Sequence, residues 1–235
     1  MPRSTLPADA PLWRRHLHAD GYGYGWLLIF ILATIGFQLA VPDDEWARVV
    51  TIGLQSVTVL ASLRAAGAHR FLVRFAVVVP LFAVLGTTGV LVGTGALGAG
   101  GGRAMALLLV LVAPAAIALG VVRQARATHA ITVRTMFGVL CIYLLVGSAF
   151  AYAFGIVGEV QSGAFFAQGI YGNQSDYLYF SFATMTTTGY GDLTAASDLG
   201  RSLAILEALI GQIYLVTVVA LIVGTIGARG VAVRR

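Results

Sequence analysis

The sequence contains no lysine and few charged residues of any kind. Only 11% of its 235 residues are charged and 58% are hydrophobic, whereas about 25% of residues are charged in a typical soluble domain. The mean hydropathy is +0.87. This composition excludes an ordinary water-soluble domain and predicts a chain that is dissolved in lipid.

Cysteine is almost absent too, and acidic residues are few. The single Cys141 lies in an apolar run, which excludes an internal disulfide framework. Ten acidic residues stand against fifteen arginines, which gives a net charge of +5 and a pI near 9.7. In a soluble protein that balance would suggest nucleic acid as a partner. Here the arginines cluster at the ends of apolar runs, so we interpret them as membrane-orientation charges and expect no nucleic-acid partner.

Long apolar runs dominate the sequence. A helix that spans a bilayer needs about 20 mostly apolar residues. Six runs come close to this length, and the second is the weakest because it contains Gln55, Ser56, Thr58 and Ser62. We therefore predict an all-α membrane protein with six transmembrane helices, at residues 25–41, 47–63, 71–93, 104–122, 135–157 and 202–227.

A shorter aromatic segment, SDYLYFSFATMTT, separates the fifth and sixth runs. Ser175 or Asp176 can cap its start. About 11 residues of helix follow, and at 1.5 Å per residue they reach only about half way through a bilayer. We predict a re-entrant pore helix here rather than a seventh span.

The arginines also orient the chain. Twelve of the fifteen lie on one side of the predicted spans, and seven of the ten acidic residues lie on the other. By the positive-inside rule both termini are cytoplasmic, and the re-entrant helix enters and leaves from the outside. Residues 1–24 would form a cytoplasmic N-terminal segment and residues 228–235 a short cytoplasmic tail, so we expect no cytoplasmic regulatory domain. The arginine-only, Ala-, Gly- and Val-rich composition favours a bacterial inner membrane.

The stretch TTTGYGD, residues 186–192, follows the predicted pore helix and is irregular. Backbone without helical hydrogen bonds is tolerated at membrane depth only where it lines a cavity. Gly189 and Gly191 can adopt left-handed conformations, which lets successive carbonyl groups point toward one axis. A ring of such carbonyls replaces the hydration shell of a cation. The C-terminus of the pore helix, which carries about half a negative charge, is directed at the same place.

One such loop per chain cannot close a ring. We find no internal repeat that would supply a second loop, so four copies are needed and we predict a homotetramer surrounded by membrane lipid. The acidic outer mouth, with Asp192 and Asp198, also suits a cation and not an anion.

The run Thr187-Thr188-Gly189-Tyr190-Gly191-Asp192 resembles the selectivity filter of the potassium channel family. In that family, rings of backbone carbonyl oxygens replace the hydration shell of the ion. The resemblance continues in DLGRS and in LEALIGQIYLVTVVALIVG, which is similar to a pore-lining helix, and it covers about residues 135–227. It implies a pore domain of outer helix, pore helix, filter and inner helix. It implies that K⁺ is bound by the carbonyls of the filter residues Thr187, Thr188, Gly189, Tyr190 and Gly191.

The resemblance also implies supporting roles around the filter. Tyr190 would pack against Tyr179 and Phe180 of the pore helix, Asp192 and Thr184 would support the filter, and Gly211 would be a gating hinge. Gly211 could alternatively be only a small packing residue. The sequence departs from the family at Thr188, where valine is commonest, and at Ala183, where some bacterial channels have a glutamate that pairs with the filter aspartate.

Glu207 is the only carboxylate inside a predicted span, where ionisable groups are costly and usually functional. It could lie near the outer interface or bond to neighbouring backbone. The sharper hypothesis is that it reaches the back of the pore helix and replaces the glutamate missing at Ala183. On that hypothesis, Glu207→Gln should speed the loss of current during prolonged activation.

Residues 25–134 would form a four-helix transmembrane domain that matches a voltage sensor only in the number of its helices. A sensor needs several arginines at three-residue spacing within the membrane field. The fourth run has no basic residue between Arg103 and Arg123. We therefore expect weak voltage dependence.

The sequence thus predicts a passive potassium-selective channel, with no enzymatic step and no cofactor other than the permeant K⁺. Two alternatives remain. A potassium transporter subunit would also use a glycine-lined filter, and a membrane sensor could bind K⁺ without conducting it.

Overall fold

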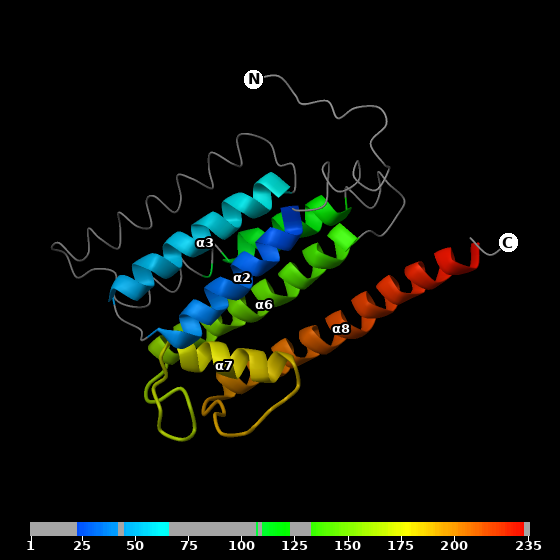
Figure 1. Ribbon diagram of the computed structural model, residues 1–235. Coiled ribbons are helices and arrows are strands. Elements are labelled where there is room, and N and C mark those ends of the chain that lie inside the picture. The colour runs from blue at the N-terminus through cyan, green and yellow to red at the C-terminus, as the bar shows by residue number, and fades with distance from the viewer. Residues whose placement is uncertain (1–22, 42–44, 66–106, 108–109, 123–132, 233–235) are drawn as a thin grey trace, which may run out of the picture.

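The structure is a computed structural model that describes residues 23–41, 45–65, 107, 110–122 and 133–232 (Figure 1). The described residues are helical, with no strand among them and one isolated antiparallel bridge between Phe166 and Ala195. The helices are α2 (Gly23–Ala40), α3 (Glu45–Ala65), α6 (Val133–Val160), α7 (Gln174–Met185) and α8 (Asp198–Ala232), together with a shorter apolar helix at Val110–Val122.

Two helices in the described part of the chain are long and apolar enough to cross a membrane. They are Thr135–Val160 within α6 and Asp198–Val218 within α8, and they coincide with the fifth and sixth predicted spans. Shorter apolar helices at Tyr24–Ala40, Val49–Leu63 and Val110–Val122 lie in the first, second and fourth predicted runs. The third run, residues 71–93, lies outside the described residues, so a total of six spans stays a prediction.

Helix α8 is longer than the predicted inner helix. It begins at Asp198, four residues before the expected start, and continues to Ala232, beyond the expected end at residue 227. The Ser197 hydroxyl accepts a hydrogen bond from Gly200 N at 3.2 Å, which satisfies one backbone donor of the first turn. Most of the stretch predicted to be a cytoplasmic tail is therefore a continuation of the helix.

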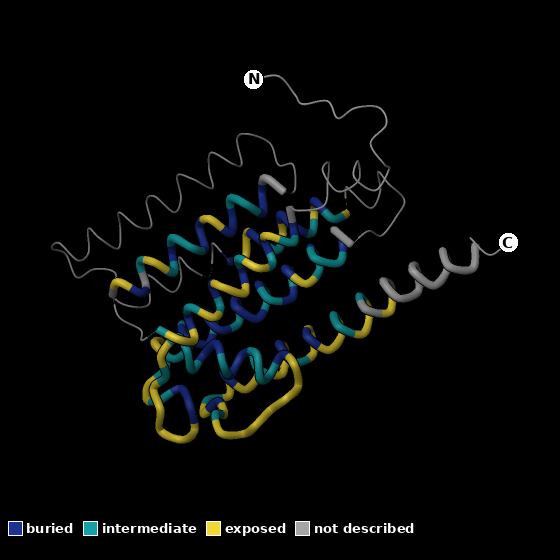
Figure 2. Tube along the Cα trace, viewed as in Figure 1, coloured by how far each residue is buried: buried dark blue, intermediate teal, exposed yellow. Residues whose placement is uncertain are grey.

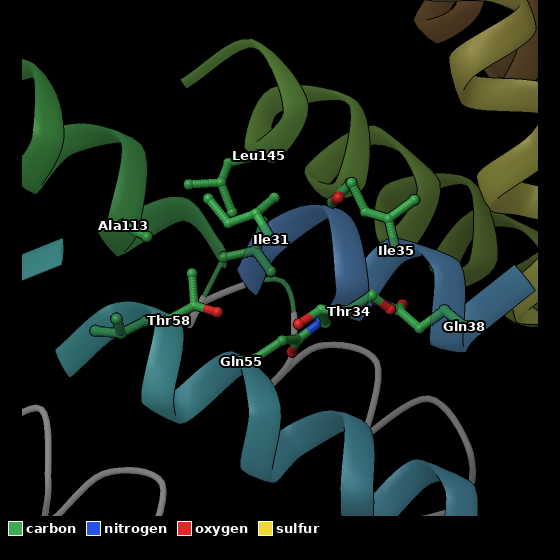
Figure 3. A pocket seen from close by; sticks show the side chains of 11 residues that line it. Ile31, Thr34, Ile35, Gln38, Gln55, Thr58, Ala113 and Leu145 are labelled. Atoms are coloured by element: carbon green, nitrogen blue, oxygen red, sulfur yellow. The ribbon is translucent and has the colours of Figure 1, made fainter. Parts of the chain in front are cut away.

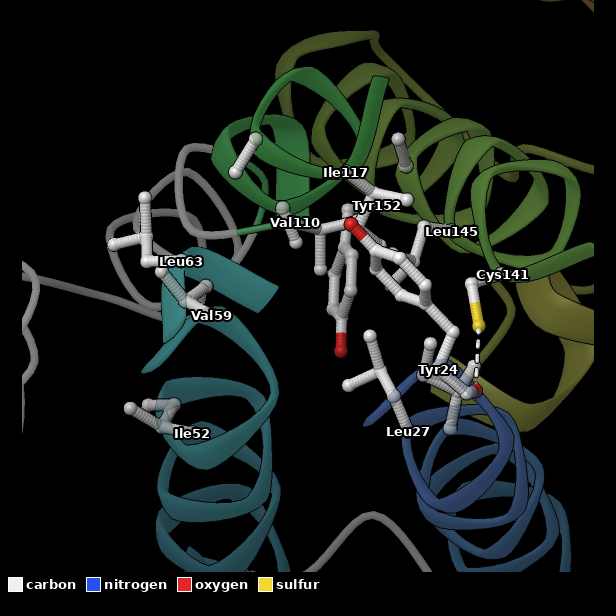
Figure 4. Close-up of a cluster of buried hydrophobic side chains, with 14 residues drawn as sticks. Tyr24, Leu27, Ile52, Val59, Leu63, Val110, Ile117, Cys141, Leu145 and Tyr152 are labelled. Atoms are coloured by element: carbon white, nitrogen blue, oxygen red, sulfur yellow. Dashed lines mark hydrogen bonds between the residues drawn. The ribbon is translucent and has the colours of Figure 1, made fainter. Parts of the chain in front are cut away.

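The first hydrophobic core joins α2, α3, the Val110–Val122 helix and α6 (Figure 4). Its fully buried members include Ile31, Val59 and Ile117. The single cysteine lies here as well, buried and unpaired with another cysteine, and its thiol faces the carbonyl oxygen of Tyr24 at 3.7 Å. The core is thus built between the N-terminal helices and the outer helix of the predicted pore domain.

The polar residues that weakened the second predicted run are buried without disrupting α3. Ser56, Thr58 and Ser62 each donate a hydroxyl hydrogen bond to the backbone carbonyl four residues earlier, at 2.6, 3.0 and 2.6 Å. Such a bond satisfies the hydroxyl inside its own helix. The side chains are therefore compatible with an apolar environment.

Gln55 makes its hydrogen bond between helices. Its Nε2 donates to Tyr152 Oη of α6, and the same hydroxyl donates to Gln38 Oε1 of α2 at 2.8 Å. We call Gln38, Gln55 and Tyr152 the polar clamp. The polar clamp joins α2, α3 and α6 by side-chain hydrogen bonds. Two of its members, Gln38 and Gln55, border a cavity of about 20 Å³ that is also lined by Thr34, Thr58 and Ser148 (Figure 3).

Helix α2 also contacts the short helix α7 of the same chain. Ser175 Oγ, in the first turn of α7, donates to the carbonyl oxygen of Leu39 at the end of α2, at 3.3 Å. Figure 1 shows α2 lying between α3 and α6, with α7 near its C-terminal end. The N-terminal helices therefore pack against their own pore region.

Candidate ion-conduction site

Helix α7, the predicted pore helix, spans Gln174–Met185 and has a complete capping box at its start. Asn173 Oδ1 accepts from Asp176 N at 2.9 Å, and Asp176 Oδ2 accepts from Asn173 N at 2.9 Å. The prediction that Ser175 or Asp176 is the N-cap was wrong by two or three residues. The reason is that Asn173 provides the capping oxygen, and Asp176 acts as the reciprocal partner at the third helical position.

Helix α7 rests on a second core made mainly of aromatic rings. Phe180 packs edge-on against Phe154, with ring centroids 5.0 Å apart, and also contacts Phe165 and Phe166 at 6.1 and 5.6 Å. Tyr177 donates its hydroxyl to the carbonyl oxygen of Tyr171 at 2.6 Å. This side of α7 is therefore fixed to α6 and to the loop between α6 and α7.

Within one chain Phe180 does not contact Tyr190, although it was expected to support the filter with Tyr179. Phe180 and Tyr179 are adjacent in the sequence, so they leave a helix in directions about 100° apart. Phe180 faces the aromatic core, and Tyr179 faces the loop after the helix. The structure brings only Tyr179 to Tyr190.

Tyr179, Tyr190 and Asp192 form one contact group. The Tyr179 and Tyr190 rings are stacked, with centroids 6.1 Å apart and planes inclined by 8°. Tyr179 Oη donates to Asp192 Oδ2 at 2.8 Å, and Asp192 Oδ1 accepts from Leu193 N at 3.0 Å. Because the carboxylate accepts this bond, the pKa of the Tyr179 hydroxyl lies above its usual value, and the hydroxyl stays a donor.

The backbone leaves α7 through hydrogen bonds to its last turn. Thr187 N donates to the carbonyl oxygen of Thr184 at 2.9 Å, and Gly189 N donates to that of Ala183 at 3.0 Å. Two carbonyls that would be left unpaired at a helix end are thereby satisfied. The Thr184 carbonyl group thus fixes the start of the loop, and a role of Thr184 in supporting a filter stays a prediction.

The backbone of residues 187–191 alternates in the sign of φ. Thr187, Gly189 and Gly191 have φ of 58°, 54° and 83°, while Thr188 and Tyr190 are not among the residues with positive φ. Chain that alternates between right- and left-handed conformations gathers its N–H groups on one side and therefore its carbonyls on the other. The conformation expected for the two glycines is present, and Thr187 shares it although it carries a Cβ.

The Thr188 side chain turns back toward the end of α7. Its Oγ1 lies 2.8 Å from Thr186 Oγ1, and Thr186 Oγ1 also donates to the carbonyl oxygen of Phe182 at 2.6 Å. The substitution of threonine for the commoner valine therefore adds a hydrogen bond on the pore-helix side of the loop.

The chain after the loop is tied to the segment that precedes α7. Ala167 N donates to the carbonyl oxygen of Thr194 at 2.8 Å, and Ala196 N donates to that of Phe165 at 2.9 Å. Arg201 Nε donates to the carbonyl oxygen of Ala195 at 3.1 Å. These bonds fix the C-terminal end of the exposed loop relative to the aromatic core.

Glu207 of α8 is fully buried behind α7. Its Oε1 lies 2.5 Å from Ser181 Oγ, and the same hydroxyl lies 2.7 Å from the carbonyl oxygen of Gly147 in α6. Asp192 makes its hydrogen bonds with Tyr179 and Leu193 instead. Glu207 thus reaches the back of the pore helix, as hypothesised, but its partner is Ser181.

Gly211 lies where α8 approaches the end of α7 most closely. A Cβ at this position would overlap the carbonyl oxygen of Met185 and would lie 2.9 Å from its Cγ. The same carbonyl accepts a hydrogen bond from Tyr143 Oη at 3.3 Å. The described part of α8 is helical on both sides of Gly211, so the structure gives this glycine a packing role, and the hinge remains a prediction.

Sequence reasoning did not identify Ser181, Tyr143 or Asn173 as parts of the site. Ser181 and Tyr143 act through partners 26 and 42 residues away, and no local pattern encodes such a contact. Asn173 could have been found, because asparagine followed three residues later by an acidic residue is the pattern of a capping box.

A family model described as "Ion channel" matches residues 138–227. The matched stretch runs from the first turns of α6 through α7 and the filter loop into α8. Searches of curated proteins and of solved structures returned no significant match. Together with the two apolar helices, the match indicates a membrane protein. Residues 138–227 are therefore similar to an ion-channel family, which supports the resemblance of this stretch to the potassium channel family.

Proposed function

We propose that the protein is a potassium-selective channel whose filter is the backbone of residues 187–191. The observation that carries this proposal is the alternation of positive φ at Thr187, Gly189 and Gly191. We infer that this alternation turns the carbonyls of residues 187–191 to one side, and a ring of carbonyls can replace the water around a dehydrated K⁺ ion. No enzymatic step is needed for this function.

The surroundings of the loop favour a cation. Helix α7 ends at Met185, directly before the filter residues, so the negative end of its dipole is close to an ion at the inner end of the filter. Asp192 adds a carboxylate at the other end. In four subunits, the helix ends alone would contribute about two negative charges.

A homotetramer is the assembly that completes such a filter. One chain supplies one loop, and that loop is open on its own, since Tyr190 is 71% exposed. Figure 2 shows exposed residues along much of the described part of α8, in contrast to α6. These exposed apolar side chains, which suit neighbouring subunits and lipid, are Leu199, Ile205, Leu206, Leu209, Ile213 and Val216.

The proposed orientation places the filter mouth outside and both termini in the cytoplasm, in a bacterial inner membrane. It is supported by the distribution of the arginines over the sequence. Cations would therefore pass between the acidic outer mouth and a cavity lined by α8.

Labelled rubidium uptake into vesicles containing the purified full-length protein tests the function. We expect uptake that is driven by a K⁺ gradient, blocked by Ba²⁺ and not reproduced with labelled sodium. Protein-free vesicles give the background. Uptake that requires a proton or sodium gradient would indicate a transporter subunit. Saturable Rb⁺ binding without uptake would indicate a non-conducting sensor, and either result would contradict the channel.

A further inference from the structure

Three helices meet at the hydroxyl of Ser181. Ser181 lies on α7, Glu207 on α8 and Gly147 on α6, and both Ser181 and Glu207 are fully buried. The Ser181 Oγ is 2.5 Å from Glu207 Oε1 and 2.7 Å from the carbonyl oxygen of Gly147. Both distances are those of hydrogen bonds between oxygen atoms.

The number of hydrogens available to the oxygen atoms of Ser181, Glu207 and Gly147 indicates whether Glu207 is protonated. A serine hydroxyl carries one hydrogen, and a backbone carbonyl can only accept. If Ser181 donates to Gly147, the contact with Glu207 is a hydrogen bond only when the carboxyl group carries a proton. An ionised Glu207 would leave two acceptor oxygens, Glu207 Oε1 and the carbonyl oxygen of Gly147, competing for the single hydrogen of Ser181.

The remaining oxygen of Glu207 gives an independent indication. Among the described residues, Oε2 is buried and has no hydrogen-bond partner. A buried carboxylate requires hydrogen bonds or an opposite charge on its oxygens. A neutral acid leaves only a carbonyl-type oxygen unpaired, which is far less costly than an unpaired charge within a membrane protein.

We propose that Glu207 is a neutral carboxylic acid that donates its proton to Ser181 Oγ, which in turn donates to the carbonyl oxygen of Gly147. This relay would join the inner, pore and outer helices one turn before the end of α7. Glu207 is then a positioning residue that acts on the filter through the pore helix. The location of the proton stands on the hydrogen bonds alone, whereas the effect on the filter rests on the proposed channel function.

The relay changes what is expected of Glu207→Gln. A glutamine amide also has hydrogens to donate to Ser181 Oγ, so it can maintain the relay. Current in this variant should decay at close to the wild-type rate, and not faster as the sequence-based hypothesis held. Glu207→Leu and Ser181→Ala both break the relay.

Infrared difference spectroscopy of the full-length protein in lipid tests the proton directly. We expect wild type minus Glu207→Gln to show the C=O stretching band of a protonated carboxylic acid near neutral pH. In Ser181→Ala that band should shift to higher frequency, because the carboxyl hydrogen loses its acceptor. Ser148→Ala is the matched control, since within the described part of the chain the Ser148 hydroxyl donates to the carbonyl oxygen of Leu144 in its own helix, and it should leave the band in place.

Two results would overturn the proposal. A difference spectrum with only carboxylate bands would show that Glu207 is ionised. A band that does not move in Ser181→Ala would show that Ser181 is not the acceptor. Neither reading depends on ion flux, so failure of the relay and failure of the channel function are distinguishable.

Current decay during prolonged activation tests the positioning role. Ser181→Ala and Glu207→Leu should each decay about five- to tenfold faster than wild type, the factor expected for the loss of one buried hydrogen bond. The double variant should decay no faster than either single variant, because both remove the same relay. The positioning role would be contradicted if current decayed equally fast in wild type and Ser181→Ala. It would also be contradicted if the effects of Ser181→Ala and Glu207→Leu were fully additive in the double variant.

Discussion

At the scale of single residues, the proposed filter loop depends on left-handed backbone conformations, which are unfavourable for residues that carry a Cβ. Thr187 has a φ of 58°, a region in which a residue with a Cβ costs about 1–3 kcal/mol. Hydrogen bonds from Thr187 N and Gly189 N to the last turn of α7 hold the loop in place. The pattern of glycines predicted two of the three left-handed positions. It could not predict the third, because Thr187 takes its conformation from the end of the helix.

Gly189→Ala tests this backbone. Its φ is 54° and, apart from its two neighbours in the sequence, none of the described residues lies within 4 Å of the added Cβ, so we expect the effect to arise from backbone strain or from a neighbouring subunit. We expect rubidium uptake to fall to background. Gly36→Ala in α2 is the control, since its Cβ would also meet nothing within 4 Å but its φ is not in the left-handed region. Equal uptake in the two variants would contradict the role of Gly189.

Tyr179→Phe tests the support of the filter by Asp192. The change removes the hydrogen bond of 2.8 Å to Asp192 Oδ2 and retains the ring that stacks on Tyr190. We expect current to decay faster during prolonged activation while selectivity is retained. Tyr171→Phe, at an exposed tyrosine in the loop before α7, should decay like wild type. The support would be refuted by Tyr179→Phe currents that decay at the same rate as those of Tyr171→Phe.

At the scale of helices, α7 is held from three sides. The aromatic core fixes the face with Phe180, Ser181 contacts α6 and α8, and Gly211 allows α8 to approach Met185. The sequence predicted that this helix exists and that it is short, from a possible capping residue and the length of the aromatic segment. It did not predict which face meets which neighbour, because those contacts join residues far apart in the chain.

Gly211→Ala separates a packing glycine from a hinge. The added Cβ would overlap the Met185 carbonyl oxygen, so α7 and α8 must move apart, at a cost of about 1–3 kcal/mol. We expect a lower thermal midpoint together with impaired conduction. Gly53→Ala in α3 has open space around its Cβ and should leave the midpoint unchanged. If Gly211→Ala alters gating at an unchanged midpoint, the glycine is a hinge and the packing role is refuted.

Tyr152→Phe tests the attachment of the N-terminal helices to the pore domain. Its hydroxyl is the centre of the polar clamp, so its loss leaves the side chains of Gln38 and Gln55 with fewer partners in a buried site. A buried polar group without a partner costs about 1–3 kcal/mol, and we expect the free energy of unfolding to fall by that order. Tyr171→Phe again serves as the control. The same unfolding curve for both variants would show that the clamp adds no stability.

At the scale of the whole molecule, the sequence predicted a lipid-dissolved helical chain with an ion-channel domain at its C-terminal end. Composition and apolar run length were sufficient for the lipid-dissolved helical chain, because a bilayer imposes both, whereas the ion-channel domain was predicted from residues 186–192 and their resemblance to a known family. The packing of α2 on α6 and α7 of the same chain was not predictable. It depends on contacts such as the hydrogen bond between Gln38 of α2 and Tyr152 of α6, and the sequence presents Gln38 only as an interruption in an apolar run.

Weak voltage dependence is expected of the assembled channel. The described helix Val110–Val122 contains no basic residue, so it carries no gating charge of the kind that supplies about 2.3 kcal/mol per 100 mV. Conductance measured in planar bilayers should change little with voltage once open-channel block is excluded. A steep conductance–voltage curve would require gating charges elsewhere in the chain.

The central claim is that the carbonyls of Thr187 to Gly191 from four chains surround K⁺ on one axis. The most direct test is an experimental density map of the purified protein in lipid, recorded in KCl. We predict a fourfold assembly with ion density along its axis, ringed by these backbone oxygens. A map in which the four loops do not meet on a common axis, or in which the protein is a monomer, would contradict the account.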